Sequence, residues 1–235
     1  MKLLGNFLSL AGAELLSKLA TILAFAHLAR VAGPVGYGYV EFAGAVLLCA
    51  ALLVDQGFGY YGAREIARDK SRRAALVGEI IFLRLALSLV AAAVMVALAF
   101  TLDRGAVQRN LLLVYALCLP ALAFQLQWIF QGYERMSSVA AIQLTRQGIF
   151  AAVVLFALHS SSDLVIAGLA EVLGALAAGV LGVWMYRAQF GAWITVVPRV
   201  AARTLREQAN RKRRRGKATR SLFPADSLQW RDSQR

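Results

Sequence analysis

The chain has 235 residues, of which 59% are hydrophobic and only 17% are charged. Soluble domains carry roughly a quarter charged residues, so this composition excludes an ordinary soluble domain and indicates a membrane protein. The formal net charge of +13 is unevenly distributed, because 13 of the 26 Lys and Arg residues lie in 187–235. We therefore predict two parts, an apolar body (1–190) and a basic, disordered tail (191–235).

Six apolar stretches of the body are long enough to cross a membrane as helices, since a span needs roughly 20 apolar residues. Glycine and proline punctuate the short gaps between them, so successive helices are expected to run antiparallel. The sequence thus predicts an all-α polytopic transmembrane helix bundle. The six predicted spans are 3–28, 38–60, 77–102, 111–130, 139–158 and 164–186.

The Lys and Arg residues of the short loops predict the orientation, because positively charged loops stay in the cytoplasm. The loops after the second and fourth spans are the most basic, and the sixth span runs into the basic tail. We therefore expect both the N-terminus and the C-terminus to be cytoplasmic. The loop residues on the predicted inner side are Arg64, Arg68, Lys70, Arg72, Arg73 and Arg135, and those on the outer side are Arg30, Arg104 and Arg109.

A glycine spacing at 57–62 resembles the G-x-G-x-x-G loop that binds dinucleotides. Such a loop follows a buried strand and opens a helix within a βαβ unit. Here the preceding run is a membrane-crossing helix, so we reject nucleotide binding. We also find no catalytic constellation, no metal-ligand spacing around Cys49 or Cys118, and no cofactor motif. The sequence therefore favours a protein that is not an enzyme.

Ionisable residues inside spans are costly and are functional candidates for that reason. Glu14 and Lys18 are four residues apart, so they either pair on a packing face or line a hydrated cavity. Asp55 lies close enough to the inner end of its span to reach water, and Arg84 can extend to the inner surface. Arg146 and Glu171 lie on consecutive spans at matching depth, so an ion pair between them is one possibility. The full candidate set is Glu14, Lys18, Arg30, Asp55, Arg84, Arg146 and Glu171.

Pro120 lies in the middle of the fourth predicted span. Proline in a helix interior removes a backbone hydrogen bond and kinks the helix. Bent helices occur where transporters open and close a cavity. We therefore treat Pro120 as a hinge candidate, with a static kink as the alternative.

Several motifs resemble one family of membrane proteins. The turn "GPVGYG", the helix end "LVDQGF", the segment "GAREIARD" and the later "WIFQGYERMSSVAAIQL" are similar to those of polysaccharide biosynthesis proteins. These are the Wzx-type oligosaccharide flippases of the multidrug/oligosaccharidyl-lipid/polysaccharide (MOP) exporter superfamily, whose fold is MATE-like. The resemblance spans roughly residues 5–190.

The resemblance implies a transporter in the bacterial inner membrane. Such proteins carry an undecaprenyl-pyrophosphate-linked oligosaccharide to the outer leaflet, for export of surface polysaccharides such as lipopolysaccharide and exopolysaccharide. The sugar head passes through a hydrated, often cationic cavity between two lobes. Guanidinium groups pair with phosphate bidentately, so the resemblance makes Arg30, Arg84 and Arg146 candidates for contact with the pyrophosphate.

The chain departs from this family in length, because its six predicted spans make one lobe only. Three explanations are open for the basic segment after residue 190: a frameshifted or truncated flippase, a half-transporter that pairs with a second half, and a basic tail with its own role. A non-transporting membrane interaction subunit is the alternative function. Expected partners are membrane lipid, the lipid-linked oligosaccharide and polysaccharide assembly proteins. A basic tail would attract anionic lipids and bind nucleic acid without specificity.

Overall fold

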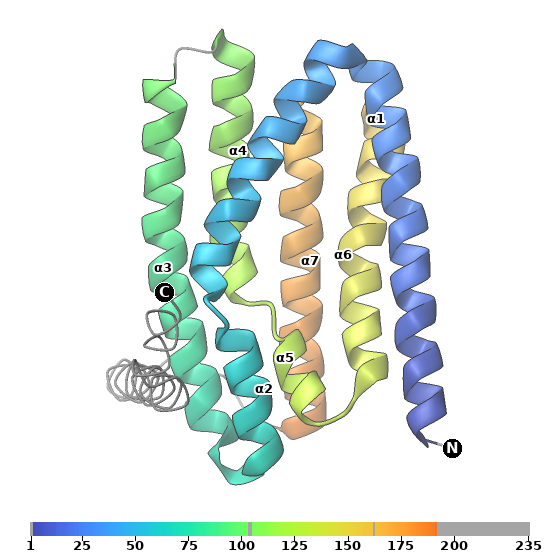
Figure 1. Cartoon of the computed structure of the whole chain (residues 1–235), viewed down its shortest axis with the longest axis vertical. Coiled ribbons are helices and arrows are strands. Elements are labelled where there is room, and N and C mark those ends of the chain that lie inside the picture. The colour runs from blue at the N-terminus through green and yellow to red at the C-terminus, as the bar shows by residue number, and fades with distance from the viewer. Residues whose placement is uncertain (1, 103–104, 162, 192–235) are drawn as a thin grey trace, which may run out of the picture. The chain divides into compact units, whose positions relative to one another are not determined.

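The computed structural model describes residues 2–102, 105–161 and 163–191, and in these ranges all regular secondary structure is helical. Five of the described helices are long and apolar enough to cross a membrane, which confirms the all-α polytopic bundle (Figure 1). The basic tail from residue 192 on lies outside the described residues. The helices are α1 (Lys2–Asp55), α2 (Phe58–Arg68), the short 3₁₀ helix η1 (Lys70–Arg72), α3 (Arg73–Thr101), α4 (Gly105–Ala123), α5 (Gln127–Gly132), α6 (Met136–Ala157) and α7 (Val165–Phe190).

Helix α1 contains the first two predicted spans in one element of 54 residues. At about 1.5 Å per residue this helix would be far longer than a bilayer is thick. It bends back at Gly33, whose φ of 67° and ψ of 176° are not helical, and Figure 1 shows its two arms on either side of that bend. The open connection predicted over 29–37 is therefore wrong, because the chain stays helical up to Gly33 and resumes at Pro34.

The inner end of the second arm differs from the prediction as well. Helix α1 ends at Asp55 rather than at residue 60, because Gln56 and Gly57 adopt positive φ values of 39° and 84°. The amphipathic helix α2 then occupies the first half of the segment 61–76 that was predicted as a basic loop. Asp55 is thereby placed at a helix terminus, with its side chain half-buried.

Close packing between α2 and α5 explains Gly62, the last glycine of the spacing at 57–62. A Cβ atom on Gly62 would lie 2.5 Å from ring carbons of Trp128, and one on Gly132 would lie 2.7 Å from the carbonyl oxygen of Ala63. Any larger side chain would push the two short helices apart. These glycines therefore serve helix packing, while Gly57 forms the turn into α2.

The fourth predicted span, 111–130, is interrupted. Helix α4 ends at Ala123, and the amides of Phe124 and Gln125 donate to carbonyls only three residues back, at 3.2 and 3.1 Å. The prediction of one continuous helix over 111–130 is wrong, because the helix is broken at 124–126, one turn after Pro120. A hinge at Pro120 stays a prediction.

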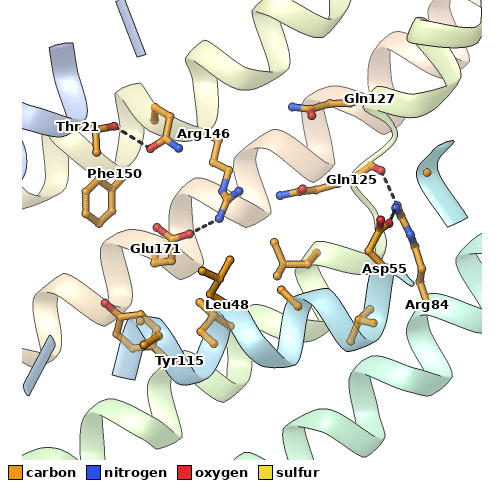
Figure 2. Close-up of a pocket in the computed structure, with 18 of the residues that line it drawn as sticks. Thr21, Leu48, Asp55, Arg84, Tyr115, Gln125, Gln127, Arg146, Phe150 and Glu171 are labelled. Carbon is orange, nitrogen blue, oxygen red and sulfur yellow. Dashed lines mark hydrogen bonds and ion pairs between the residues drawn. The ribbon is translucent and has the colours of Figure 1, made fainter. Parts of the chain in front are cut away.

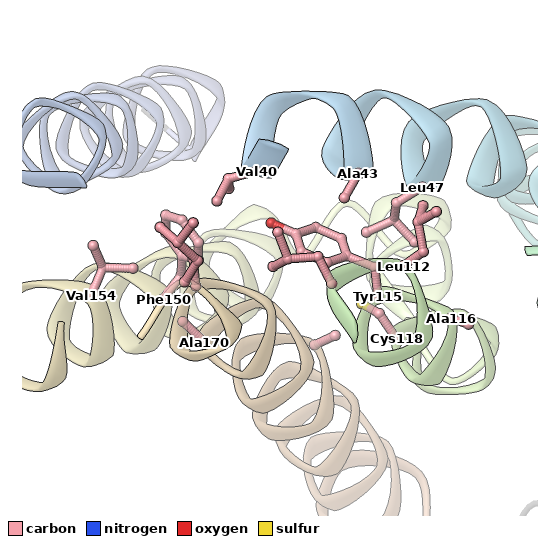
Figure 3. Close-up of a cluster of buried hydrophobic side chains, with 14 of the residues drawn as sticks. Val40, Ala43, Leu47, Leu112, Tyr115, Ala116, Cys118, Phe150, Val154 and Ala170 are labelled. Atoms are coloured by element: carbon pink, nitrogen blue, oxygen red, sulfur yellow. The ribbon is translucent and has the colours of Figure 1, made fainter. Parts of the chain in front are cut away.

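The core of the body lies between the second arm of α1, α4, α6 and α7. Tyr115 of α4 is 5% exposed and lies among apolar side chains of all three neighbours (Figure 3). Small residues of α7 let it approach its neighbours closely: a Cβ on Gly168 would lie 3.1 Å from the Tyr115 ring. Toward the bend of α1, the His27 ring nitrogen Nε2 is 3.0 Å from the carbonyl oxygen of Leu158, which joins the first arm of α1 to α6.

Candidate functional site

A cavity of about 700 Å³ opens between the helices of the body. Its walls come from both arms of α1 and from α2 to α7, and they include charged, amide and aromatic side chains. This volume lies within the range of ligand-binding pockets. Polar groups at membrane depth are expensive unless they meet one another or water, so the cavity is the candidate site.

The first of two ion pairs in the cavity joins Asp55 to Arg84 (Figure 2). Arg84 also donates from Nη1 to the carbonyl oxygen of Gln125, at 3.2 Å. The Arg84 side chain is only 9% exposed, so the expectation that it extends to the inner surface is wrong. The pair links the end of α1 to α3, and the second Arg84 contact reaches the break between α4 and α5.

The second ion pair joins Arg146 of α6 to Glu171 of α7. The sequence predicted that these two residues lie at matching depth on consecutive spans. The two helices approach closely here, since a Cβ on Gly174 would lie 2.7 Å from the carbonyl oxygen of Arg146. The side chains remain 28% and 17% exposed, so the pair faces the cavity rather than a dry core.

Four hydrogen-bond donors in the cavity walls are buried without an acceptor in the described part of the chain. Each such donor costs roughly 1–3 kcal/mol when it is left unpaired, so this concentration in one place is unusual. Each of these atoms has almost no exposed surface, so an acceptor oxygen of water or of a ligand would reach it only after a neighbouring side chain moves. The donors are Arg84 Nε, Arg146 Nε, Gln125 Nε2 and Trp128 Nε1.

The charges that line the cavity do not add up to a positive surface. Two arginines, Arg84 and Arg146, face three carboxylates, those of Glu41, Asp55 and Glu171. The cationic cavity that the family resemblance implies is thus absent from this described lining, because each arginine already has an acidic partner. The lining favours an oxygen-rich ligand over one recognised by net charge alone.

Three sequence-predicted candidates lie away from this cavity. Glu14 and Lys18 pair at 3.4 Å, with side chains 45% and 69% exposed, and Gln143 donates a hydrogen bond to Glu14. The pair therefore lies outside the cavity and contacts α6 through Gln143. Arg30 is exposed, near the bend of α1. The structure brings together only Asp55, Arg84, Arg146 and Glu171.

The amide and aromatic residues of the cavity were not among the predicted site residues. Gln125 lies at the break after α4, and Gln127, Trp128 and Gln131 follow on α5. Gln147 of α6 receives a 3.3 Å hydrogen bond from Thr21 of α1. The available signal was the density of glutamine around "QLQWIFQG" and "QLTRQG", which is unusual for membrane spans.

Together these features define a polytopic helical membrane protein with an open cavity between its helices, lined by apolar side chains and by two ion pairs. The family model described as "Polysaccharide biosynthesis protein" matches residues 3–213, which is most of the chain, and the chain belongs to this family. The match runs past residue 190 into the basic segment.

One curated relative adds to this assignment. The chain is 26% identical over 184 residues to the "Putative O-antigen transporter" of Escherichia coli (strain K12), an alignment that covers 75% of this chain and 43% of the relative. The aligned part therefore covers less than half of that relative. No solved structure matches the chain.

Proposed function

We propose that this chain forms one lobe of a flippase that moves a lipid-linked oligosaccharide across the bacterial inner membrane. The cavity would receive the oxygen-rich head of the substrate, while the lipid tail stays in the bilayer. The observation that carries this proposal is the set of four unpaired donors around the two ion pairs. Sugar hydroxyl and phosphate oxygens are acceptors of the kind these donors lack.

The ion pairs give the cavity a means to accept an anionic group despite its lack of net positive charge. A phosphate oxygen that approached Arg146 would compete with Glu171 for the guanidinium, which binds either acid in the same forked geometry. In the same way, a ligand oxygen would compete with Asp55 for the Arg84 guanidinium. Substrate entry would thus exchange one charge-assisted contact for another, rather than expose a bare cation in the membrane.

A second lobe belongs to this proposal. Family members resembling this chain have two lobes, and the curated relative is more than twice as long as the part that aligns. We therefore expect transport from an assembly of this lobe with a second half, and a lone lobe to be inactive. The alternative, a membrane subunit without transport activity, predicts no dependence on the cavity residues.

Complementation tests the proposal directly. Residues 1–190 would be fused to the second half of the Escherichia coli relative and produced in a strain that lacks its own flippase. We expect surface polysaccharide to return with the fusion and not with residues 1–190 alone. A fusion that reaches the membrane at normal levels but never restores surface polysaccharide would contradict the proposed transport role.

The proposed orientation places α2, η1 and α5 at the cytoplasmic surface. The basic residues of these segments outnumber those at the opposite end, as the positive-inside rule requires. Reporter fusions at Arg72 and at Ser161 are therefore expected to report opposite sides, with Arg72 inside. Fusions that report the same side would rule out this topology.

A further inference from the structure

Three cationic side chains surround two aromatic rings at the end of the helix bundle where η1, α5 and the end of α7 lie. The cluster consists of Lys70, Arg73, Arg135, Tyr133 and Phe190. Lys70 Nζ lies 5.6 Å from the centre of the Tyr133 ring. The Arg73 guanidinium lies 4.3 Å from the Phe190 ring, and that of Arg135 lies 5.3 Å from the same ring. None of these five residues lines the central cavity, so the cluster is a separate site.

Fixed contacts hold this cluster together. The rings of Tyr133 and Phe190 are 4.7 Å apart between centroids. Arg73 donates from Nη1 to the Tyr133 hydroxyl at 3.1 Å, and Arg135 donates to the side-chain oxygen of Gln189. Three segments that are distant in sequence therefore meet at one point, with the cationic groups arranged before any ligand arrives.

The three cations of the cluster outnumber the two carboxylates that flank them in sequence, Asp69 and Glu134, so the cluster has a net positive charge. Aromatic faces attract cations by about 0.5–1 kcal/mol at exposed sites, which offsets only part of the repulsion among three like charges. Arg73 Nε is buried without an acceptor in the described chain, and the side chains of Lys70 and Arg135 are exposed. A phosphate group would supply both negative charge and acceptor oxygens.

We propose that this cluster binds the phosphate of an anionic phospholipid, such as phosphatidylglycerol. The position favours a lipid over a soluble phosphate, because exposed aromatic residues such as Trp184 on α7 mark the level of the headgroups. An exposed apolar stripe runs along α7 toward the cluster and would contact the acyl chains. The stripe consists of Leu169, Leu173, Leu176, Val180 and Trp184, which are 42–69% exposed.

Native mass spectrometry of the full chain in detergent tests this site, with phosphatidylglycerol or phosphatidylcholine added at equal concentration. Each basic residue near a membrane surface contributes about fivefold in affinity for anionic lipid, so Lys70 and Arg135 together contribute about thirtyfold. We expect the native chain to bind the anionic lipid about thirtyfold more tightly than the zwitterionic one. The double variant Lys70→Gln, Arg135→Gln should lose this preference.

The control is a second double variant that removes the same charge from the same end. Arg64→Gln with Arg68→Gln alters exposed residues of α2 outside the cluster, and it should keep the preference to within about threefold. Equal binding of both lipids by the native chain would overturn the proposal. An equal loss of preference in the control variant would also overturn it, because the attraction would then be diffuse. Displacement of the lipid by inorganic phosphate at millimolar concentration would overturn it too, because the cluster would then be a free-phosphate site.

Discussion

Replacing Arg146 with alanine is expected to abolish restoration of surface polysaccharide by the two-lobed fusion, while the protein still inserts in the membrane. The substitution removes the guanidinium from the cavity and leaves the Glu171 carboxylate without its partner. Loss of one member of a fully buried pair costs roughly 3–5 kcal/mol. The cost here should be smaller, because both side chains retain contact with the cavity. The measurement is surface polysaccharide per unit of membrane-inserted protein.

Two further variants separate a role in transport from a role in packing. Exchanging the pair, Arg146→Glu with Glu171→Arg, keeps an ion pair between α6 and α7, and it should recover most of the thermal stability that Arg146→Ala loses. Transport should stay low, because the guanidinium then extends from the opposite wall. Arg30→Ala serves as the control, since Arg30 is exposed and outside the cavity, and it should leave transport within about twofold of the native level.

The outcome that would contradict this prediction is normal transport by a well-inserted Arg146→Ala fusion. Arg146 and Glu171 would then only hold α6 against α7. Recovery of transport by the exchanged pair would point the same way, because a packing contact depends on the presence of the pair and not on which helix carries the cation.

The long apolar helices were predictable because hydrophobicity decides membrane insertion before any detail of packing. Helix α6 was predicted at 139–158 and extends over Met136–Ala157, and α7 was predicted at 164–186 and extends over Val165–Phe190. The errors of the prediction concern where helices end and where they are interrupted. Helix α1 remains helical through the expected gap at 29–37, where only Gly33 leaves helical geometry, because a membrane favours satisfied backbone hydrogen bonds wherever a helix can supply them.

The site was predictable only in part, for a related reason. A charge in an apolar span stands out by itself, so Asp55, Arg84, Arg146 and Glu171 were all found from the sequence. Which charges meet depends on the packing of helices. The Asp55–Arg84 pair depends on α1 ending at Asp55, before a turn at Gln56 and Gly57 that was not predicted.

The remaining cavity residues carry no comparable signal. A single uncharged residue such as Gln125 or Trp128 stands out less in an apolar span than a charge does, so it does not mark a site by itself. Gln125 matters because the unpredicted break after α4 turns its carbonyl oxygen toward Arg84. Helix packing, and not the sequence pattern, therefore decides most of the cavity wall.

Gly174→Ala is expected to lower both the stability of the body and its transport activity. The added Cβ would lie 2.7 Å from the carbonyl oxygen of Arg146, and a backbone atom cannot rotate away as a side chain can. Overpacking of this kind costs about 1–3 kcal/mol, which exceeds the roughly 0.5–1 kcal/mol that alanine gains over glycine in a helix. The measurements are the thermal unfolding midpoint in detergent and surface polysaccharide from the fusion.

Gly148→Ala is the matched control, because Gly148 lies in α6 two residues beyond Arg146 and a Cβ there meets no atom within 4 Å. It should be neutral or slightly stabilising, through helix propensity alone. Equal stability of the two variants would mean that α6 and α7 have room to separate at Gly174. The carbonyl oxygen that the added Cβ would contact belongs to Arg146, which pairs with Glu171. Separating α6 from α7 therefore displaces the ion pair as well. Transport by Gly174→Ala should therefore fall further than the loss of folded protein explains.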